Sequence, residues 1–91
     1  MNLTLHLKKE YFLEIKHGHK TEEYRLITPY WQKRLKNRKY DKIIFCLGYP
    51  KSNDIHRRII SEWKGYTKKT ISHSLFGDIP VEVYAIKICI S

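Results

Sequence analysis

The first part of the chain changes from an alternating to a helical pattern of apolar residues. In residues 3–7 leucines alternate with polar side chains, and this period of two predicts a half-buried strand. In residues 8–17 the apolar positions recur at helical spacing, which predicts an amphipathic helix that ends at Gly18. The inner face of this helix would hold Tyr11, Phe12 and Ile15.

A second strand and a second helix follow. Residues 20–26 have extended character. Thr28 followed by Pro29 is typical of a helix start, because threonine caps free amide groups and proline fits the first turn. On this helix we expect Trp31 and Leu35 to face the core. A stripe on another face would hold Tyr30, Arg34 and Arg38.

The second half of the chain is rich in strand-forming segments. Residues 41–48, 59–67 and 81–90 each predict a strand, whereas residues 48–54 and 68–80 predict loops. The strands are too close together for long crossovers. The order of elements therefore predicts an α+β fold, a small curled mixed sheet or partial barrel with two short helices packed on it.

The second strand concentrates the candidate chemistry. Alternation places Glu23 and Arg25 on one face, and it places Tyr24 and Leu26, which we interpret as the core side, on the other. The charged pair then either lies in solvent as a surface ion pair or lines a cleft. In a cleft, Lys20, Glu23 and Arg25 would be able to bind a phosphate or a base. A partly desolvated carboxylate beside cations can also act as a general base.

Length and charge narrow the class of protein. With 91 residues the chain is long enough for one domain, residues 1–91, built on one hydrophobic core. Its 18 Lys and Arg outnumber nine Asp and Glu, so the net charge is +9. Such a field attracts polyanions, and we expect nucleic acid as the partner. Positive charge that serves only solubility is the alternative.

Membranes, metals and cofactors are not expected. The longest apolar run, residues 43–47, is far shorter than the roughly 20 residues that cross a bilayer. The N-terminus lacks the form of a signal peptide, so we expect a cytoplasmic protein. The histidines show no metal-ligand spacing. Cys46 and Cys89 lie in apolar runs and predict buried, reduced thiols, while a disulfide between them stays open.

Basic and aromatic residues elsewhere extend the candidate surface. Cations spaced around aromatic rings suit a nucleic-acid strand, because phosphates attract the cations and exposed bases stack on the rings. We predict contacts with nucleic acid from Lys20, Arg25, Tyr30, Arg34, Arg38, Tyr49 and Arg57. His73, in an irregular segment beside aromatic residues, is a candidate acid or base at neutral pH, with an ordinary loop histidine as the alternative.

The order of several short motifs resembles that of ASCH-domain proteins, especially the small ones from bacteriophages and prophages. The segment "GHKTEEYR" fits a GxKTxExR pattern, and "PYWQKRL", "GYP", "WKGY", "SHSLFG" and "PVEVYAI" follow it. This resemblance covers nearly the whole chain. It implies a PUA-like fold, a mixed β-barrel of about five or six strands with two flanking short helices. It also implies a cleft to which Lys20, Glu23 and Arg25 contribute.

Three kinds of function follow from these observations. The leading hypothesis is a domain that binds RNA or single-stranded nucleic acid in this cleft. The second is an enzyme at the same cleft. A ribonuclease could use Lys20, Glu23 and His73, whereas a modified-nucleoside amidohydrolase is disfavoured because Glu23 stands where the resemblance would require threonine. The third is a phage-encoded inhibitor that docks on an acidic host protein.

Overall fold

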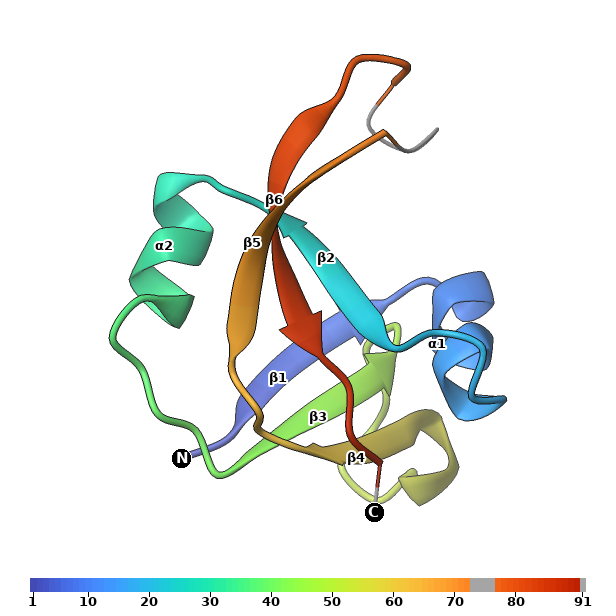
Figure 1. Ribbon diagram of the computed structural model, residues 1–91. Coiled ribbons are helices and arrows are strands. Elements are labelled where there is room, and N and C mark those ends of the chain that lie inside the picture. Colours follow the sequence, from blue (N-terminus) through green and yellow to red (C-terminus); the bar gives the residue numbers. More distant parts are fainter. Residues whose placement is uncertain (73–76, 91) are drawn as a thin grey trace.

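The computed structural model describes residues 1–72 and 77–90, and Figure 1 shows the elements that they form. In chain order these are β1 (Leu3–Leu7), α1 (Lys9–Lys16), β2 (Glu22–Leu26), α2 (Pro29–Leu35), β3 (Lys42–Leu47), the 3₁₀ turn η1 (Ile55–Arg57), β4 (Arg58–Glu62), β5 (Tyr66–Ile71) and β6 (Val81–Lys87). With two α-helices and six strands in the described residues, the predicted α+β class is confirmed.

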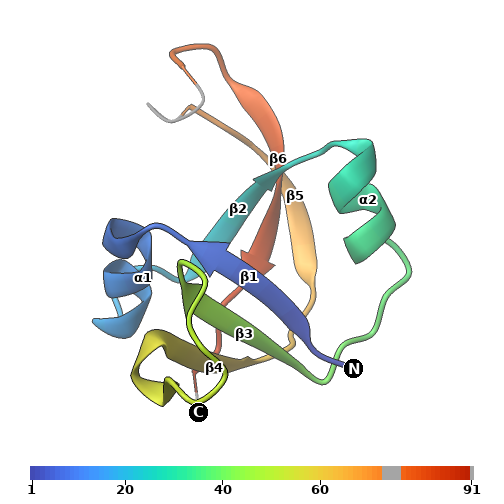
Figure 2. The same cartoon turned by 180° about the vertical axis from the view of Figure 1, so that it is seen from behind.

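The strands form two three-stranded sheets. In one sheet β3 lies between β1, to which it is parallel, and β4, to which it is antiparallel. In the other, β6 lies between β2 and β5 and is antiparallel to both. Figures 1 and 2 show α1 and α2 on opposite sides of the molecule. The element order predicted a curled mixed sheet or partial barrel, and the resemblance implied a mixed β-barrel. No ladder within the described residues closes the two sheets into a barrel.

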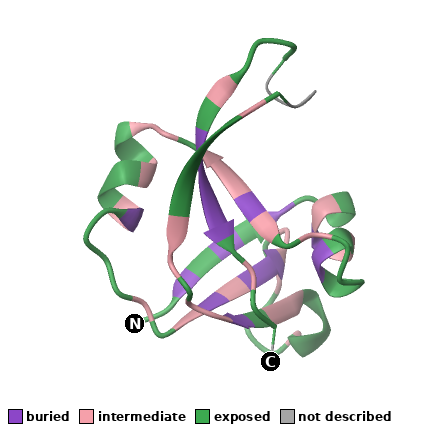
Figure 3. Ribbon diagram, viewed as in Figure 1, coloured by how far each residue is buried: buried purple, intermediate pink, exposed green. Residues whose placement is uncertain are grey.

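One hydrophobic core joins both sheets and both helices. Figure 3 shows buried segments of β1, β3 and β6 at the centre of the molecule. The core cluster consists of Leu3, Leu5, Leu7, Phe12, Ile15, Leu35, Ile43, Phe45, Tyr84 and Ile86. In β1, buried and exposed residues alternate strictly, which confirms the strand that the period of two predicted.

Both helix boundaries that flank β2 are formed as predicted. At the end of α1 the amide of Gly18 donates to the carbonyl of Ile15 (3.1 Å), and Gly18 adopts a φ of +76° that glycine tolerates well. At the start of α2 the amide of Trp31 donates to Oγ1 of Thr28 (3.3 Å).

The two α-helices, α1 and α2, have eight and seven residues. No helix in the described ranges is long and apolar enough to cross a membrane.

The second half of the chain differs from the prediction in its strand boundaries. Residues 59–67 were expected to form one strand, but residues 59–62 belong to β4 and residues 66–67 to β5. Residues 63–65 connect the two strands, and Gly65 turns the chain there with a φ of +81°. Residues 68–71 were expected to be irregular, yet they continue β5 because β6 supplies their hydrogen-bonding partner. The last strand ends at Lys87, before the predicted end.

The stripe predicted on the second helix is shorter than expected. α2 ends at Leu35, and Asn37 turns the chain with a φ of +56°. Arg38 therefore lies beyond the helix that carries Tyr30 and Arg34. The helical pattern of charges continued past the last helical residue, so spacing alone placed the end of the helix too late.

The two cysteines differ in exposure. Both are free thiols, but Cys46 is buried and Cys89 is exposed. The expectation of two buried thiols is right for Cys46 and wrong for Cys89, which lies beyond the end of β6. Burial raises the pKa of the Cys46 thiol, which makes the reactive thiolate rarer there.

Candidate functional site

β2 turns its charged face inward, opposite to the predicted orientation. Its register with β6 puts Glu23 and Arg25 directly across from Ile86 and Tyr84 of the hydrophobic core. Glu23 is 5% exposed, whereas Leu26, which was predicted on the core side, is 38% exposed. The predicted core side of this strand is therefore wrong. A carboxylate can occupy such a position only when nearby groups compensate its charge.

Glu23 is held between two cations. The Nζ of Lys20 lies 2.6 Å from its Oε1, and the Nη2 of Arg25 lies 2.7 Å from its Oε2. The side chains are 6% exposed for Glu23, 16% for Lys20 and 20% for Arg25, so water screens the charges only weakly. The structure thus brings together the three residues that the GxKTxExR pattern grouped.

An aromatic ring accompanies each of the two cations. The Nζ of Lys20 lies 4.9 Å from the ring centroid of Tyr11 on α1. The Cζ of Arg25 lies 5.0 Å from the ring of Trp31 on α2. Cation–π contacts of this kind contribute from about 0.5 to about 2 kcal/mol, the larger values where water is excluded. Each cation is therefore fixed by the carboxylate on one side and by a ring on another.

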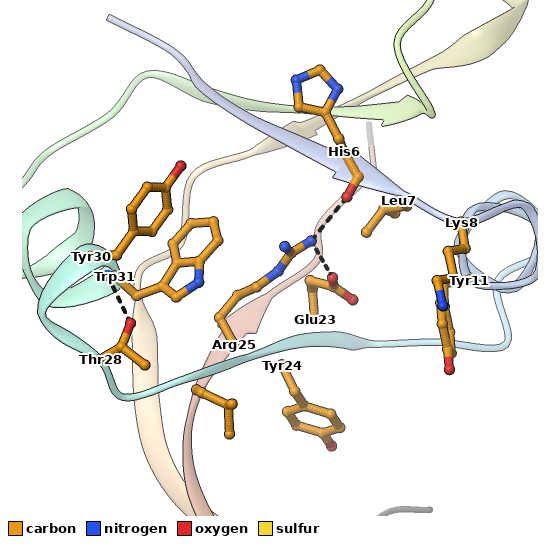
Figure 4. A pocket seen from close by; sticks show the side chains of 11 residues that line it. His6, Leu7, Lys8, Tyr11, Glu23, Tyr24, Arg25, Thr28, Tyr30 and Trp31 are labelled. Atoms are coloured by element: carbon orange, nitrogen blue, oxygen red, sulfur yellow. Dashed lines mark hydrogen bonds and ion pairs between the residues drawn. The ribbon is translucent and has the colours of Figure 1, made fainter. Parts of the chain in front are cut away.

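A pocket of about 440 Å³ opens beside these side chains, within the size range of ligand-binding sites. Figure 4 shows Glu23 and Arg25 pointing from β2 toward β1, with Tyr11 on one side and Trp31 on the other. The residues that line the pocket are His6, Leu7, Lys8, Tyr11, Glu23, Tyr24, Arg25, Leu26, Thr28, Tyr30 and Trp31. β2 thus forms the middle of the pocket, and the two helices supply its aromatic sides.

Arg25 has one buried donor without a hydrogen-bond partner among the described residues. Its Nη2 also donates weakly to the backbone carbonyl of His6 (3.4 Å). Its Nε is buried, and no acceptor among the described residues is within hydrogen-bonding reach. An unpaired buried donor costs about 1–3 kcal/mol, and groups of this kind are unusual enough to require an explanation. An acceptor on a bound molecule, or a bound water, would satisfy it.

Two tyrosines at the pocket keep their protons at neutral pH. Partial burial raises the pKa of Tyr11, and the carboxylate of Glu10 raises it further. Burial also raises the pKa of Tyr24, whose hydroxyl donates to Oε1 of Glu22 (3.2 Å). The hydroxyl of Tyr24 is thereby engaged on the other face of β2. Tyr11 is the tyrosine whose ring stands beside Lys20.

Three more of the predicted residues lie at or next to this pocket. Tyr30 lines it. The guanidinium of Arg34 lies over the ring of Tyr30, with Cζ 3.6 Å from the centroid. Tyr49 stacks on His6 with ring centroids 4.2 Å apart. Tyr30, Arg34 and Tyr49 all line a second pocket that shares residues with the first.

The other predicted residues are not part of this group. The Nε of Arg38 donates to the carbonyl of Lys33 (3.4 Å), and the Nε of Arg57 pairs with Oδ2 of Asp54 (3.2 Å). Neither arginine is among the described residues that line the two pockets. His73 lies outside the described residues, so its role as an acid or base stays a prediction.

Sequence reasoning missed three residues of the site. Tyr11 and Trp31 were assigned to the core; both do pack against it, and both also line the pocket. His6 was placed on the polar face of its strand, and its backbone carbonyl reaches Arg25. A usable signal existed for Trp31, because α2 begins at Pro29, soon after the end of β2. An aromatic residue in that first turn must lie near the end of the strand.

Neither a search for metal sites in the described residues nor a comparison with known proteins suggests a further function. In residues 1–72 and 77–90 there is no group of three or more His, Cys, Asp or Glu side chains that could hold a metal ion. Comparison of the chain with protein-family models, with curated proteins and with solved structures gave no significant match. The function of the pocket is therefore inferred from its own residues.

Proposed function

We propose that this chain binds RNA or another single-stranded nucleic acid and takes one base into the pocket between α1 and α2. The observation that carries the proposal is the position of Glu23, buried between Lys20 and Arg25 with an aromatic ring beside each cation. A hydrogen-bond acceptor, fixed positive charge and aromatic surface are the groups with which proteins recognise an unpaired nucleotide.

Each group in the pocket has a counterpart on a nucleotide. The carboxylate of Glu23 would accept a hydrogen bond from an exocyclic amino group, as glutamate does from the N4 of cytosine. Tyr11 and Trp31 offer aromatic surface, and stacking contributes about 1–3 kcal/mol per base. A pocket of about 440 Å³ suits one nucleotide. Bases in a duplex are stacked and paired, so an unpaired base is the better ligand.

The charge of the protein favours a polyanion over a small neutral ligand. The chain has a net charge of +9, and Lys8 and Arg25 line the pocket itself. A nucleic acid that contacts these groups releases bound counterions, which supplies affinity that falls steeply as salt rises. This dependence on salt distinguishes a strand of nucleic acid from a free nucleoside.

Membership of the ASCH family, with its PUA-like fold, is part of this proposal. Two sheets share one core with two helices beside them, an arrangement compatible with a PUA-like barrel that is open between its sheets. The support comes from Lys20, Glu23 and Arg25, because residues that the motif spaces along the chain form one ion-pair cluster. Glu23 and Arg25 line the pocket, and Lys20 pairs with Glu23 without lining it.

A ribonuclease is the second candidate, favoured by a buried carboxylate directly beside a lysine. Both oxygens of Glu23 are engaged by cations, which serves orientation more than proton transfer. Figure 4 shows the imidazole of His6 pointing away from Glu23, so this described histidine does not form an acid–base pair with it. Binding is therefore the function that the geometry supports better.

The test is a titration of labelled single-stranded RNA, duplex RNA and single-stranded DNA across a salt series. Strand length is checked on a denaturing gel from the same samples. We expect saturable binding of single-stranded RNA, a steep loss of affinity with salt, and intact strands. Glu23→Gln should lower the affinity about tenfold, which corresponds to the loss of one good contact to a base.

Glu22→Gln is the matched control, because it makes the same change of charge on the opposite face of β2. It should leave the affinity within about twofold of the native value. Absence of binding to all three nucleic acids, or equal effects of the two variants, would overturn the proposal. Shortened RNA that stays intact with Glu23→Gln would instead establish the ribonuclease.

A further inference from the structure

A second pocket of about 380 Å³ lies next to the first. Four residues line both pockets: His6, Arg25, Tyr30 and Trp31. The guanidinium of Arg25 and the ring of Trp31, which lie 5.0 Å apart, therefore form a shared wall. A chain-like ligand seated in the first pocket can continue into the second by passing over this wall.

Two exposed tyrosines and an arginine are among the residues that line the second pocket. Tyr49 is 87% exposed and Tyr30 is 55% exposed. The Nη1 of Arg34 donates to the carbonyl of Tyr30 (3.3 Å), and its guanidinium covers the ring of Tyr30. Among the described residues no carboxylate forms an ion pair with Arg34. Arg34 thus keeps most of its five donors for a phosphate.

Tyr49 is exposed but not loosely placed. Its ring stacks on the imidazole of His6, with centroids 4.2 Å apart and 22° between the planes. The Nδ1 of His6 lies 2.7 Å from the carbonyl oxygen of Gly48, and since a carbonyl can only accept, Nδ1 carries the hydrogen. This hydrogen bond orients the imidazole. The second face of the Tyr49 ring is left as a fixed platform for stacking.

We infer that the second pocket binds the nucleotide next to the one held in the first pocket, with its base stacked on Tyr49 and its phosphate bound by Arg34. This inference rests on the proposed function and extends it from one nucleotide to two. Cations that share a groove with aromatic platforms are the means by which proteins follow a single strand, because phosphates and bases alternate along it. Arg25, common to both pockets, would contact the linkage between the two nucleotides.

The experiment compares the four ribonucleoside 5′-monophosphates with the four matching 5′-phosphorylated homodinucleotides, which carry one phosphate per nucleotide, by isothermal titration calorimetry. For the preferred base, the dinucleotide should bind about tenfold more tightly than the monophosphate, as expected for one added stacked base. Tyr49→Ala should remove this gain and leave the affinity for the monophosphate unchanged. The control is Ile55→Ala, since Ile55 is 73% exposed and does not line either pocket.

A second pair of variants tests the phosphate contact. Arg34→Gln should reduce the salt dependence of single-stranded RNA binding by about 0.7 in log–log slope, the value for one contact to a single strand. Arg57→Gln, which removes the same charge outside both pockets, should leave the slope unchanged. Because Arg34 and Tyr49 contribute to the surface rather than to the core cluster, these variants should fold.

The outcomes separate this inference from the function on which it rests. Equal affinities for monophosphates and dinucleotides, or equal effects of Tyr49→Ala and Ile55→Ala, would overturn the inference about the second pocket. The proposed function of the first pocket would still stand. If neither monophosphates, dinucleotides nor longer single-stranded RNA bind, both proposals fail together.

Discussion

β2 carries two adjacent glutamates whose ion pairs have similar lengths and different surroundings. Glu23 faces inward with its side chain 6% exposed and a cation on each carboxylate oxygen. Glu22 faces the opposite side with its side chain 17% exposed. One of its oxygens, Oε1, accepts both from the Nζ of Lys69 (2.7 Å) and from the hydroxyl of Tyr24 (3.2 Å). The two sites differ in how completely their partners are removed from water.

The comparison shows that an ion pair by itself says little about function. Lys69 is 47% exposed, so water and salt weaken the outer pair, which mainly connects β2 with β5 across the central strand. The cations of the inner site are largely buried, and each also contacts an aromatic ring. Only the inner site combines charge, aromatic surface and an adjacent pocket. That combination distinguishes a binding site from a structural contact.

Removal of the inner carboxylate should have the largest effect. Glu23→Ala leaves Lys20 and Arg25 partly buried without their partner, and we expect the free energy of unfolding to fall by about 3–5 kcal/mol. Glu22→Ala should cost less than about 1 kcal/mol, because its partner is half exposed. Urea unfolding of the two variants measures the difference. Equal losses would show that the two faces of β2 are not as different as their exposures indicate.

Replacement of Arg25 by lysine should have an effect of intermediate size. Arg25→Lys keeps the positive charge but removes the planar guanidinium that lies beside Trp31. We expect RNA affinity to fall about fivefold and the free energy of unfolding to fall by about 1 kcal/mol. Lys69→Arg, the corresponding exchange on the outer face, should change neither. Binding titrations and thermal unfolding test this, and native affinity in Arg25→Lys would contradict a specific role for the guanidinium.

The smallest effect concerns the alkaline stability of the outer pair. The hydrogen bond with Glu22 raises the pKa of Lys69 above its ordinary 10.5. Burial is the main cause that raises the pKa of Tyr24 above 10.0, and the carboxylate of Glu22 is the second cause. Groups with raised pKa values stabilise the fold fully below the ordinary value, and this contribution is lost as pH rises through the raised pKa. Unfolding free energy should therefore fall above about pH 10.

Glu22→Gln should show a smaller alkaline loss than the native protein, because it removes the group that raises the pKa of Lys69. Urea midpoints at about pH 9 and about pH 11 measure the two losses. Tyr11 and Tyr84, whose pKa values are also raised, contribute to both proteins and cancel in the comparison. An identical loss in native and variant protein would assign the alkaline dependence to Tyr11, Tyr84, the Cys46 thiol and the burial of Tyr24, and would exclude a measurable contribution from the pair of Glu22 and Lys69.

Most of the local elements around the pocket were predictable. The alternation in residues 3–7, the helix end at Gly18 and the cap at Thr28 are all confirmed. The orientation of β2 was not predictable in the same way. Alternation separates the two faces of a strand, but it does not say which one is buried when one face carries charges and the other carries Tyr24 and Leu26.

Local sequence alone determined the strand at residues 3–7, the end of α1 at Gly18 and the start of α2 after Thr28, because periodicity and capping depend on residues that are close in the chain. It also grouped Lys20, Glu23 and Arg25. Only the tertiary structure decided that Glu23 is buried, that the helices place an aromatic ring beside each cation, and that Tyr49 stacks on His6. The burial of Glu23 against β6 and the stacking of Tyr49 on His6 depend on contacts between segments far apart in the chain. The two ring contacts depend on how α1 and α2 pack beside β2.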